Sequence, residues 1–337
     1  MKIDAVTYGH PLAATGAEAA AAQARGYDGW FVSETTHDPL LACVAAGLAT
    51  DGLEIGTAIA VAFPRSPMHV AYAAHDLQAL TGGRFVLGLG TQIRPHVERR
   101  FSATWSKPAA RMREYVQALR AIWHAWATGE RLAFEGEFYR HTLMTPFFTP
   151  ADHGHGPPAV WLAAVGPRMT EVTGEVADGL LCHGFSTDRY LEEVTLPRLA
   201  SGAAAAGRER RDIEVVQPVF VVTGDTDEQR ADAEAMVKGQ LAFYGSTPAY
   251  RGVLDLHGWG ELHEELHRRS RADEWASMPE LIDEEVLRAF AVVADPAEVG
   301  TAIRERFGHL ADRISLATSY AFDEDGWREL LADLRRD

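Results

Sequence analysis

Short apolar segments alternate with longer amphipathic segments through the first hundred residues, and this alternation limits the possible folds more than any other feature of the sequence. Apolar runs at residues 3–8, 29–33, 53–62 and 84–90 have the length and composition of β-strands. The segments between them have the pattern of helices. Strands and helices that alternate in this way form a parallel sheet whose strands are joined by helices.

The alternation continues toward the end of the chain, although the spacing becomes less even. Four further strands are predicted at residues 160–164, 179–182, 213–222 and 313–317. Eight strands with helices between them close most simply into a (β/α)8 barrel, the TIM barrel of the α/β class. A doubly wound open sheet is the alternative architecture.

No internal repeat and no long linker divides the sequence, so we expect one barrel domain over residues 1–337. Some stretches do not fit the regular strand–helix units, and we expect them to be insertions that shape the substrate pocket. These stretches are residues 91–107, 129–158 and 243–287.

The composition excludes several classes of protein. With 32 Lys and Arg against 48 Asp and Glu, the formal net charge is −16, which opposes binding to nucleic-acid phosphates. No apolar run approaches the ~20 residues of a membrane span, and the first residues have the pattern of a strand rather than of a signal peptide. Cys43 and Cys182 are too few for a disulfide framework. We therefore expect a cytoplasmic protein with a small-molecule substrate and without nucleic-acid or membrane partners.

The carboxyl ends of the strands are where the chemistry of such a barrel is expected. The fourth predicted strand ends in Gly88, Gly90 and Thr91, where glycine would let a ligand approach the backbone closely. A plain glycine-rich turn explains the same residues. The dinucleotide-binding motif is excluded because Ile93 stands at the place of its third glycine.

The fifth predicted strand leads directly into the start of a helix. Gly166 and Pro167 open this helix, and Arg168 follows them. Free backbone N–H groups at a helix start favour a phosphate group, and an arginine adds positive charge. A helix cap without any ligand is the alternative interpretation.

Acid–base candidates follow three of the strands. Glu34 and His37 come after the second strand, His183 after the sixth and His10 after the first. Histidine titrates near neutral pH and can donate or accept a proton there. Each of these histidines is also compatible with a purely structural role.

One motif suggests a different chemistry. His263, Glu264 and His267 match the H-E-x-x-H pattern, in which two histidines on one helical face bind zinc. The third histidine of the extended motif is missing, and the segment lies in the insertion at residues 243–287. A zinc hydrolase is therefore a remote alternative, and a solvated charged helix is the main interpretation of this segment.

Several segments together resemble the luciferase-like monooxygenase superfamily, and in particular its branch that uses the deazaflavin coenzyme F420. The resemblance covers most of the chain in the order of the family. It is carried by residues 26–34, 53–59, 64–67, 82–90, 134–139, 163–167 and 177–179.

This resemblance implies a bacterial-luciferase-like barrel with the deazaflavin ring at the strand mouths. It also implies a non-prolyl cis peptide behind the ring, at Ala58 and Ile59. The turns after the fourth and fifth strands would line the side chain and phosphate of the coenzyme, and we add His183 from the sixth. The predicted cofactor-binding residues are Ala58, Ile59, Gly88, Gly90, Thr91, Gln92, Ala164, Val165, Gly166, Pro167, Arg168 and His183.

Two departures from the family pattern bear on the chemistry. The acidic residue and the histidine after the second strand are adjacent in the family, whereas here Glu34 is followed by Thr35, and His37 comes two residues late. Members that oxidise glucose phosphate carry a glutamate where this chain has Ile93, which argues against that substrate.

The resemblance implies hydride transfer between carbon five of the deazaflavin and a small organic substrate. That substrate would be an activated C=C, C=N or C=O group, or the corresponding reduced compound, and His37 would move the proton with the help of Glu34. An FMN-dependent monooxygenase is the alternative within the fold, and a non-catalytic relative is another. The family also implies a homodimer or a larger homo-oligomer.

Overall fold

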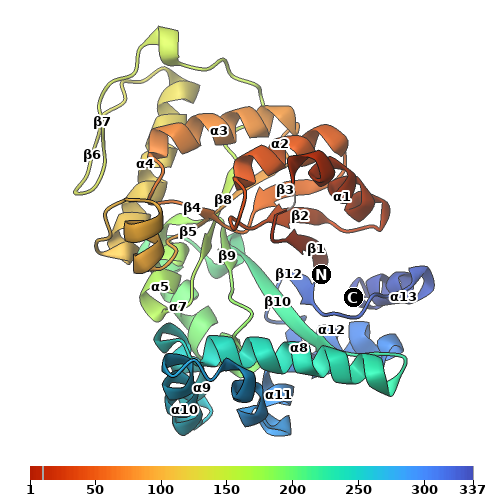
Figure 1. The fold of residues 1–337 in the computed structure, drawn as a ribbon. Coiled ribbons are helices and arrows are strands. Elements are labelled where there is room, and N and C mark those ends of the chain that lie inside the picture. The colour runs from red at the N-terminus through yellow and green to blue at the C-terminus, as the bar shows by residue number, and fades with distance from the viewer. Residues whose placement is uncertain (10, 337) are drawn as a thin grey trace.

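The computed structural model describes residues 1–9 and 11–336, so the candidate His10 lies outside the described part of the chain. Its central feature is a closed barrel of parallel strands surrounded by helices (Figure 1). The barrel strands are β1 (Lys2–Thr7), β2 (Gly29–Val32), β3 (Glu54–Thr57), β5 (Phe85–Gly90), β8 (Ala159–Ala163), β9 (Gly179–Leu181), β10 (Glu214–Val222) and β12 (Arg313–Ala317). They pair in this order, and β12 pairs with β1 to close the ring. The predicted (β/α)8 barrel is confirmed, and the open-sheet alternative is wrong.

Most of the barrel strands are buried on both faces. All residues of β2 and β5 are buried, as expected for parallel strands with helices outside and packed side chains inside. The strand predicted at residues 53–62 is divided: β3 ends at Thr57, and β4 (Ala60–Val61) pairs with the end of β5. Another short strand, β11 (Ala291–Val293), pairs with the end of β10.

Side-chain caps mark where two of the helices around the barrel begin. The Asp38 carboxylate accepts hydrogen bonds from the N–H groups of Leu40 and Leu41, and the Ser66 hydroxyl accepts one from Met68. The helices that begin at Pro39 and Pro67 therefore both start at a side-chain cap followed by proline.

The helices that surround the barrel are α1 (Leu12–Ala24), α2 (Pro39–Ala49), α3 (Pro67–Leu80), α4 (Pro108–Thr128), α5 (Pro167–Val176), α6 (Asp188–Tyr190), α7 (Leu196–Ala205), α12 (Val299–Phe307) and α13 (Glu324–Leu334). Shorter helical turns are η1 (His96–Arg100), η2 (Pro146–Phe148), η3 (Leu191–Thr195), η4 (Arg210–Asp212), η5 (Pro248–Tyr250), η6 (Trp275–Leu281) and η7 (Pro296–Glu298).

A buried ion pair and two aromatic rings fill the amino-terminal half of the barrel interior. Arg313 and Asp4 are fully buried, and their side chains are 2.6 Å apart. The guanidinium carbon lies 5.6 Å from the ring of Phe31 and 5.2 Å from that of Trp161, and these two rings stack at 5.2 Å. Because the rings fill the interior above the ion pair, this barrel is a packed core and not a channel.

A long arm lies outside the barrel between α4 and β8. It contains the antiparallel pair β6 (Phe134–Glu135) and β7 (Arg140–His141), and it returns along α3 (Figure 1). The Tyr72 hydroxyl of α3 donates a 2.6 Å hydrogen bond to the carbonyl of Phe148, and His75 contacts the carbonyl of Ala151 at 3.2 Å. These contacts hold the arm against α3.

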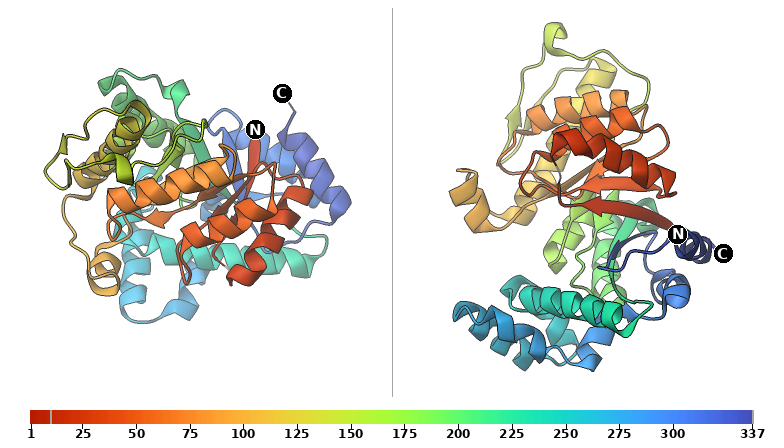
Figure 2. Two further views of the ribbon diagram at one scale, coloured as in Figure 1. Left: turned by 90° about the horizontal axis from the view of Figure 1, so that it is seen from above. Right: turned by 45° about the vertical axis from the view of Figure 1, so that its right-hand side comes forward.

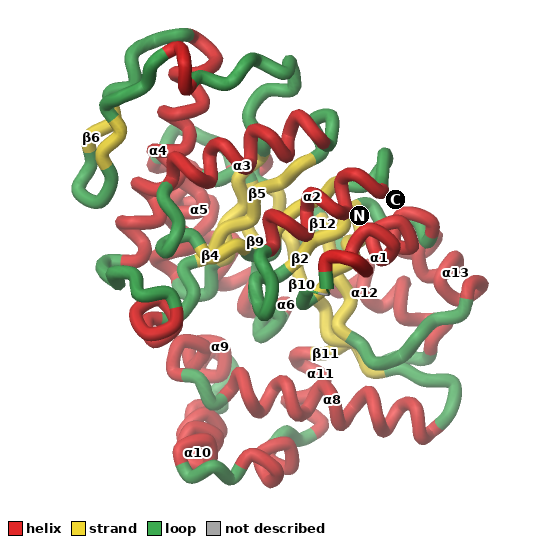
Figure 3. Tube along the Cα trace, turned by 45° about the horizontal axis from the view of Figure 1, so that its top comes forward, coloured by secondary structure: helices red, strands yellow, loops and turns green. Residues whose placement is uncertain are grey.

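The segment between β10 and β11 forms a separate helical layer beside the barrel. Figure 3 shows this layer away from α1, α2 and α3. It consists of α8 (Asp227–Gly245), α9 (Arg251–Leu256), α10 (Gly260–Arg271) and α11 (Glu284–Phe290). Its apolar side chains pack with Phe185 and Phe220 of the barrel into one hydrophobic cluster. The carboxyl ends of β9 and β10 are therefore covered by this layer.

The amino terminus lies close to the last helix, α13 (Figure 2). The amino group of Met1 is 3.4 Å from the carbonyl oxygen of Leu334 in α13. Among the described residues, no helix combines the length and the apolar character that a membrane span requires.

Candidate active site at the barrel mouth

A cis peptide bond joins Ala58 to Ile59, at the position that the resemblance implied. The end of β2 holds this segment. The Ser33 hydroxyl donates to the Ala58 carbonyl at 2.6 Å, and the N–H of Glu34 donates to the Ile59 carbonyl at 3.1 Å. Both carbonyls of the cis segment are therefore bonded, and the segment has a defined place at the carboxyl end of β3.

Ala58 and Ile59 form an apolar floor at the mouth of the barrel. Both are partly exposed, whereas the flanking Thr57 and Ala60 are buried. They pack on an interior cluster whose buried members are Phe31, Val86, Trp161, Leu181 and Val216. The mouth therefore presents a supported apolar surface rather than an open hole.

Gly88 and Gly90 are required by contacts within the barrel. A Cβ atom at Gly88 would collide with the backbone oxygen of Thr57, and one at Gly90 would lie 2.7 Å from Cγ1 of Ile59. Both glycines are buried. The sequence analysis offered two interpretations of these glycines, close approach of a ligand and a plain glycine-rich turn. The structure adds a third reason: they let β5 approach β3 and make room for Ile59.

The turn after β5 leads into a basic loop. Thr91 and Gln92 are partly exposed, and Gln92 has a left-handed backbone with φ of 59°. Farther along the loop, Arg100 donates a 2.5 Å hydrogen bond to the carbonyl of Thr35. The loop is thus attached to the segment that follows β2, and Thr91 and Gln92 border the mouth.

Glu34 is a bracing residue in this structure. Its side chain is 6% exposed, and its carboxylate accepts hydrogen bonds from the Val61 N–H at 2.7 Å and from Arg65 at 2.6 Å. Burial disfavours the charge of Arg65, but its hydrogen bonds to Glu34 and Asp38 outweigh that effect and raise its pKa. The carboxylate therefore joins the end of β2 to β4.

His37 is not bonded to this carboxylate. Within residues 1–9 and 11–336, no hydrogen bond or ion pair joins Glu34 to His37. The His37 side chain is exposed, and its Cδ2 lies 3.9 Å from the position that a Cβ of Gly9 would occupy. The structure thus places His37 beside the end of β1, accessible from solvent.

The start of α5 offers open space beside β8. Apart from Gly166 and its two neighbours in the chain, no atom of the described residues lies within 4 Å of the position that a Cβ of Gly166 would occupy, and Val165 is partly exposed. The first backbone N–H groups of a helix have no partner within it and can bind an anion. The Arg168 guanidinium, however, turns to Glu171 at 2.8 Å. Ala164 is buried and bonded to β9, so the open space at this turn lies at Gly166 and not at Ala164.

His183 follows β9 and uses both ring nitrogens. Nδ1 accepts the N–H of Phe185 at 3.0 Å, and Nε2 lies 3.1 Å from the Tyr250 hydroxyl. The His183 ring stacks on that of Tyr250 at 4.4 Å and meets Tyr244 edge-on at 4.6 Å. Burial lowers the pKa of His183 to about 4. The sequence analysis missed both tyrosines because they lie in an insertion and belong to no recognisable motif.

The H-E-x-x-H segment has a structural role on α10. Nδ1 of His263 lies 2.7 Å from the carbonyl oxygen of Gly245, and Nδ1 of His267 lies 2.9 Å from that of Ser246. The two rings therefore cap the carboxyl end of α8. Across the described ranges, no group of three ligating side chains is placed to hold a metal ion, so the geometry gives no support to the zinc-hydrolase alternative.

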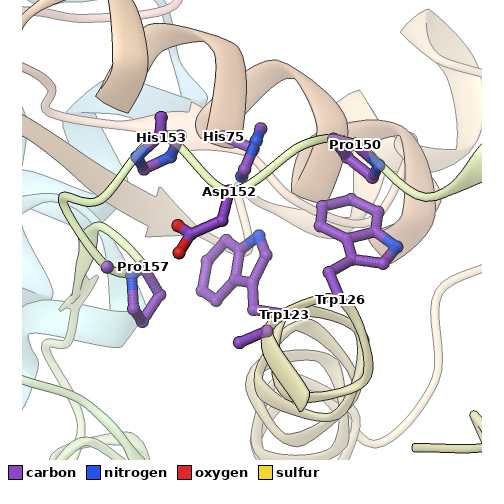
Figure 4. Close-up of a pocket in the computed structure, with 9 residues that line it drawn as sticks. His75, Trp123, Trp126, Pro150, Asp152, His153 and Pro157 are labelled. Carbon is purple, nitrogen blue, oxygen red and sulfur yellow. The ribbon is translucent and has the colours of Figure 1, made fainter. Parts of the chain in front are cut away.

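A small cavity lies outside the barrel between α3, α4 and the returning arm (Figure 4). His75, His153 and Asp152 line one side, and Trp123 and Trp126 line the other. Its volume of about 50 Å³ is enough for a few water molecules. None of the predicted site residues borders it, so it is separate from the mouth.

Comparison with known proteins identifies the family. The luciferase-like monooxygenase family matches this chain over residues 2–313. An uncharacterized protein of Mycobacterium tuberculosis is 50% identical over 325 residues, which are 96% of this chain and 95% of that protein. The F420-dependent glucose-6-phosphate dehydrogenase of Nakamurella multipartita is 30% identical over 273 residues, 76% of each chain.

Solved structures with the same fold bind different cofactors. The coenzyme F420-dependent tetrahydromethanopterin reductase of Methanopyrus kandleri matches with a TM-score of 0.77 and 17% identity, over 98% of this chain and 96% of that one. A riboflavin lyase with modified FMN matches with a TM-score of 0.73 and 16% identity, over 99% and 91%. At these identities the structural matches support the fold alone. The family match over residues 2–313 covers most of the sequence, and the chain belongs to the luciferase-like monooxygenase family.

Proposed function

We propose that this protein is an F420-dependent oxidoreductase that transfers a hydride between carbon five of the deazaflavin and a small organic substrate. The proposal is carried by the apolar floor of Ala58 and Ile59 at the mouth, next to the open start of α5. A relative that is 30% identical bears an F420-dependent name. Because Ile93 replaces the glutamate of the glucose-phosphate-oxidising members, we propose a substrate other than glucose phosphate.

The residues at the mouth fit a flat ring with an anionic side chain. A ring plane can lie on Ala58 and Ile59, which are supported from below by the interior cluster. A phosphate can approach the start of α5, because the Cβ position of Gly166 is open and the backbone N–H groups there lack helical partners. Thr91 and Gln92 border the same space. Bound there, a deazaflavin supplies or accepts a hydride at its carbon five.

The contribution of the chain is to orient the reactants and to move a proton. Glu34 and Ser33 hold the floor in position through their bonds to the cis segment and to β4. His37 is exposed at the mouth and is free to exchange a proton with solvent, as an acid–base residue requires. We therefore assign positioning to Glu34 and proton transfer to His37.

An FMN-dependent monooxygenase is the second candidate. It is favoured by the family itself, which is described as luciferase-like monooxygenases. The same floor would accept a flavin ring, so the fold does not discriminate between the two. Oxygen uptake during turnover separates them, because hydride transfer from a deazaflavin consumes no oxygen.

Fluorescence titration with each cofactor tests the proposal. The chain has eight tryptophans, so quenching of their emission reports binding. We expect F420 to bind more tightly than FMN and the Gly166→Val variant to bind F420 at least about tenfold more weakly, because the new side chain would occupy the open space beside α5.

The matched control for this variant is Gly239→Val in α8, where the Cβ position is also open. This substitution should leave F420 affinity unchanged. Preference for FMN would support the monooxygenase instead. Binding of neither cofactor, or equal effects of the two valine substitutions, would contradict the proposed site.

A further inference from the structure

Three aromatic side chains from distant parts of the chain meet beside the mouth. His183 follows β9, Tyr244 lies near the end of α8, and Tyr250 ends η5. The ring centroids of Tyr250 and Tyr244 are 4.4 Å and 4.6 Å from that of His183. We call these residues the His–Tyr cluster.

The hydrogen bonds within this cluster have a defined direction. Nδ1 of His183 accepts the backbone N–H of Phe185, so that nitrogen carries no proton. Burial lowers the pKa of His183 to about 4 and keeps the ring neutral near pH 7. A neutral imidazole then carries its single proton on Nε2. Nε2 therefore donates its hydrogen to the Tyr250 oxygen, 3.1 Å away.

This direction leaves the hydrogen of the Tyr250 hydroxyl available. Among residues 1–9 and 11–336, His183 is the one hydrogen-bond partner of this hydroxyl. A phenol can accept one hydrogen bond and donate another. Burial, together with nearby Tyr244, raises the pKa of Tyr250 to about 12, so the group stays protonated at neutral pH. Tyr250 is thus an oriented donor that has no acceptor among the described residues.

The cluster lies at the carboxyl ends of the barrel strands, which is the end that also carries the floor. His183 follows a barrel strand directly, and a Cβ on the next residue, Gly184, would contact Phe220 of β10 at 3.5 Å. Tyr244 is close enough to Tyr8, which follows β1, for the two to interact electrostatically. In the barrel order, β10 and β12 separate β9 from β1. The cluster therefore extends along one side of the mouth between these two strand ends.

We propose that Tyr250, positioned by His183, donates its proton to the carbonyl oxygen of a ketone or aldehyde substrate. This inference rests on the proposed function, which supplies the hydride donor. In the reduction, a hydride from the reduced deazaflavin forms the new C–H bond, and the π electrons of C=O move to oxygen. The O–H bond of Tyr250 breaks as the substrate gains its O–H bond. The phenolate that remains accepts the Nε2–H of His183 until a proton returns from solvent, and this exchange with solvent is the proton transfer that the proposed function assigns to His37.

Binding of 4-nitrophenolate tests the donor without any cofactor, because its oxygen anion resembles the developing alkoxide. A hydrogen bond to a charged oxygen corresponds to about ten- to a hundredfold in affinity. We expect Tyr250→Phe to weaken 4-nitrophenolate binding by that factor, measured by absorbance titration. Nitrobenzene, which has the same ring without the oxygen anion, should bind both proteins equally.

Tyr72→Phe is the matched control variant. It removes a tyrosine hydroxyl that bonds to Phe148 outside the mouth, and it should bind 4-nitrophenolate like the wild type. Equal affinity of wild type and Tyr250→Phe for 4-nitrophenolate would overturn the inference. Equal weakening by Tyr72→Phe and Tyr250→Phe would overturn it too, because the effect would then not be specific to the cluster.

Steady-state kinetics separate this inference from the proposed function. With F420 and a ketone that the wild type reduces, Tyr250→Phe should lower kcat/KM at least about a hundredfold and leave F420 affinity unchanged. If the wild type binds 4-nitrophenolate through Tyr250 but does not bind F420, the proposed function fails and the donor assignment stands. If F420 binds and Tyr250→Phe retains full kcat/KM, the proton-donor role is wrong and the proposed function stands.

Discussion

At the scale of single residues, His183 shows how burial sets the protonation state of a side chain at the mouth. The ring is enclosed by Tyr244, Tyr250 and Phe185, and no carboxylate of residues 1–9 and 11–336 compensates a positive charge on it. Its pKa is lowered from 6.5 to about 4, and burial is the cause. Folding therefore favours the neutral ring, and the unfolded chain binds the proton first as the pH falls.

We predict that His183 makes stability depend on pH between about 6.5 and 4. Its contribution is fully present above pH 6.5 and is lost as the pH falls toward 4, because the unfolded state gains the proton earlier. The loss amounts to roughly 3 kcal/mol. Urea denaturation at several pH values checks this. The His183→Gln variant, which cannot titrate, should lose less stability than the wild type over this range; parallel curves would contradict the prediction.

The two residues predicted as a catalytic pair should respond differently to substitution. His37 is exposed, so His37→Ala should leave the free energy of unfolding within about 0.5 kcal/mol of wild type. F420 affinity should stay nearly unchanged, while kcat should fall about a hundredfold.

Glu34→Gln breaks a nearly buried ion pair with Arg65 and should lower the free energy of unfolding by about 3 kcal/mol. Urea denaturation and steady-state kinetics on both variants check this, and full turnover in His37→Ala would remove its assigned role.

At the scale of elements, the contact between β5 and the cis segment determines the shape of the floor. Ile59 fits because Gly90 has no side chain; Ile59 lies between β3 and β4, which both pair with β5. The sequence analysis located these glycines correctly at a strand end. It could not identify Ile59 as the reason for Gly90, because strand pairing brings together these two residues, which are 31 positions apart.

A double-mutant cycle tests this contact. Gly90→Ala places a Cβ about 2.7 Å from Cγ1 of Ile59, so we predict a destabilisation of about 2 kcal/mol. In an Ile59→Ala background the clashing atoms are absent, and the same glycine substitution should cost clearly less. Urea denaturation of the four proteins measures the coupling. Additive effects would show that Gly90 is required for a reason other than Ile59.

At the scale of the whole molecule, α2 carries an exposed apolar stripe. Leu41, Val44 and Leu48 follow helical spacing and are 56%, 38% and 71% exposed. An apolar stripe of this kind on a barrel helix is typical of a protein–protein interface. We therefore expect the homo-oligomer implied by the family to form through this face.

Substitution of the stripe tests this expectation. The double variant Leu41→Glu and Leu48→Glu should sediment as a monomer in analytical ultracentrifugation, while the wild type sediments as a dimer or larger. Phe147→Glu is the control, because Phe147 is 88% exposed but lies on the arm between α4 and β8. Dissociation by Phe147→Glu alone would move the interface to the arm, and a monomeric wild type would contradict the oligomer itself.

The sequence by itself determined the barrel and the end of the barrel where the site was sought. Apolar runs, helix caps such as Asp38 and Ser66, and glycines at strand ends act over a few neighbouring residues, so their pattern is visible along the chain. The tertiary structure alone decided which side chains meet there. Arg65 reaches Glu34 across 31 positions, and Tyr250 reaches His183 across 67. Such contacts depend on how the barrel closes and how its insertions pack, and local sequence patterns do not encode them.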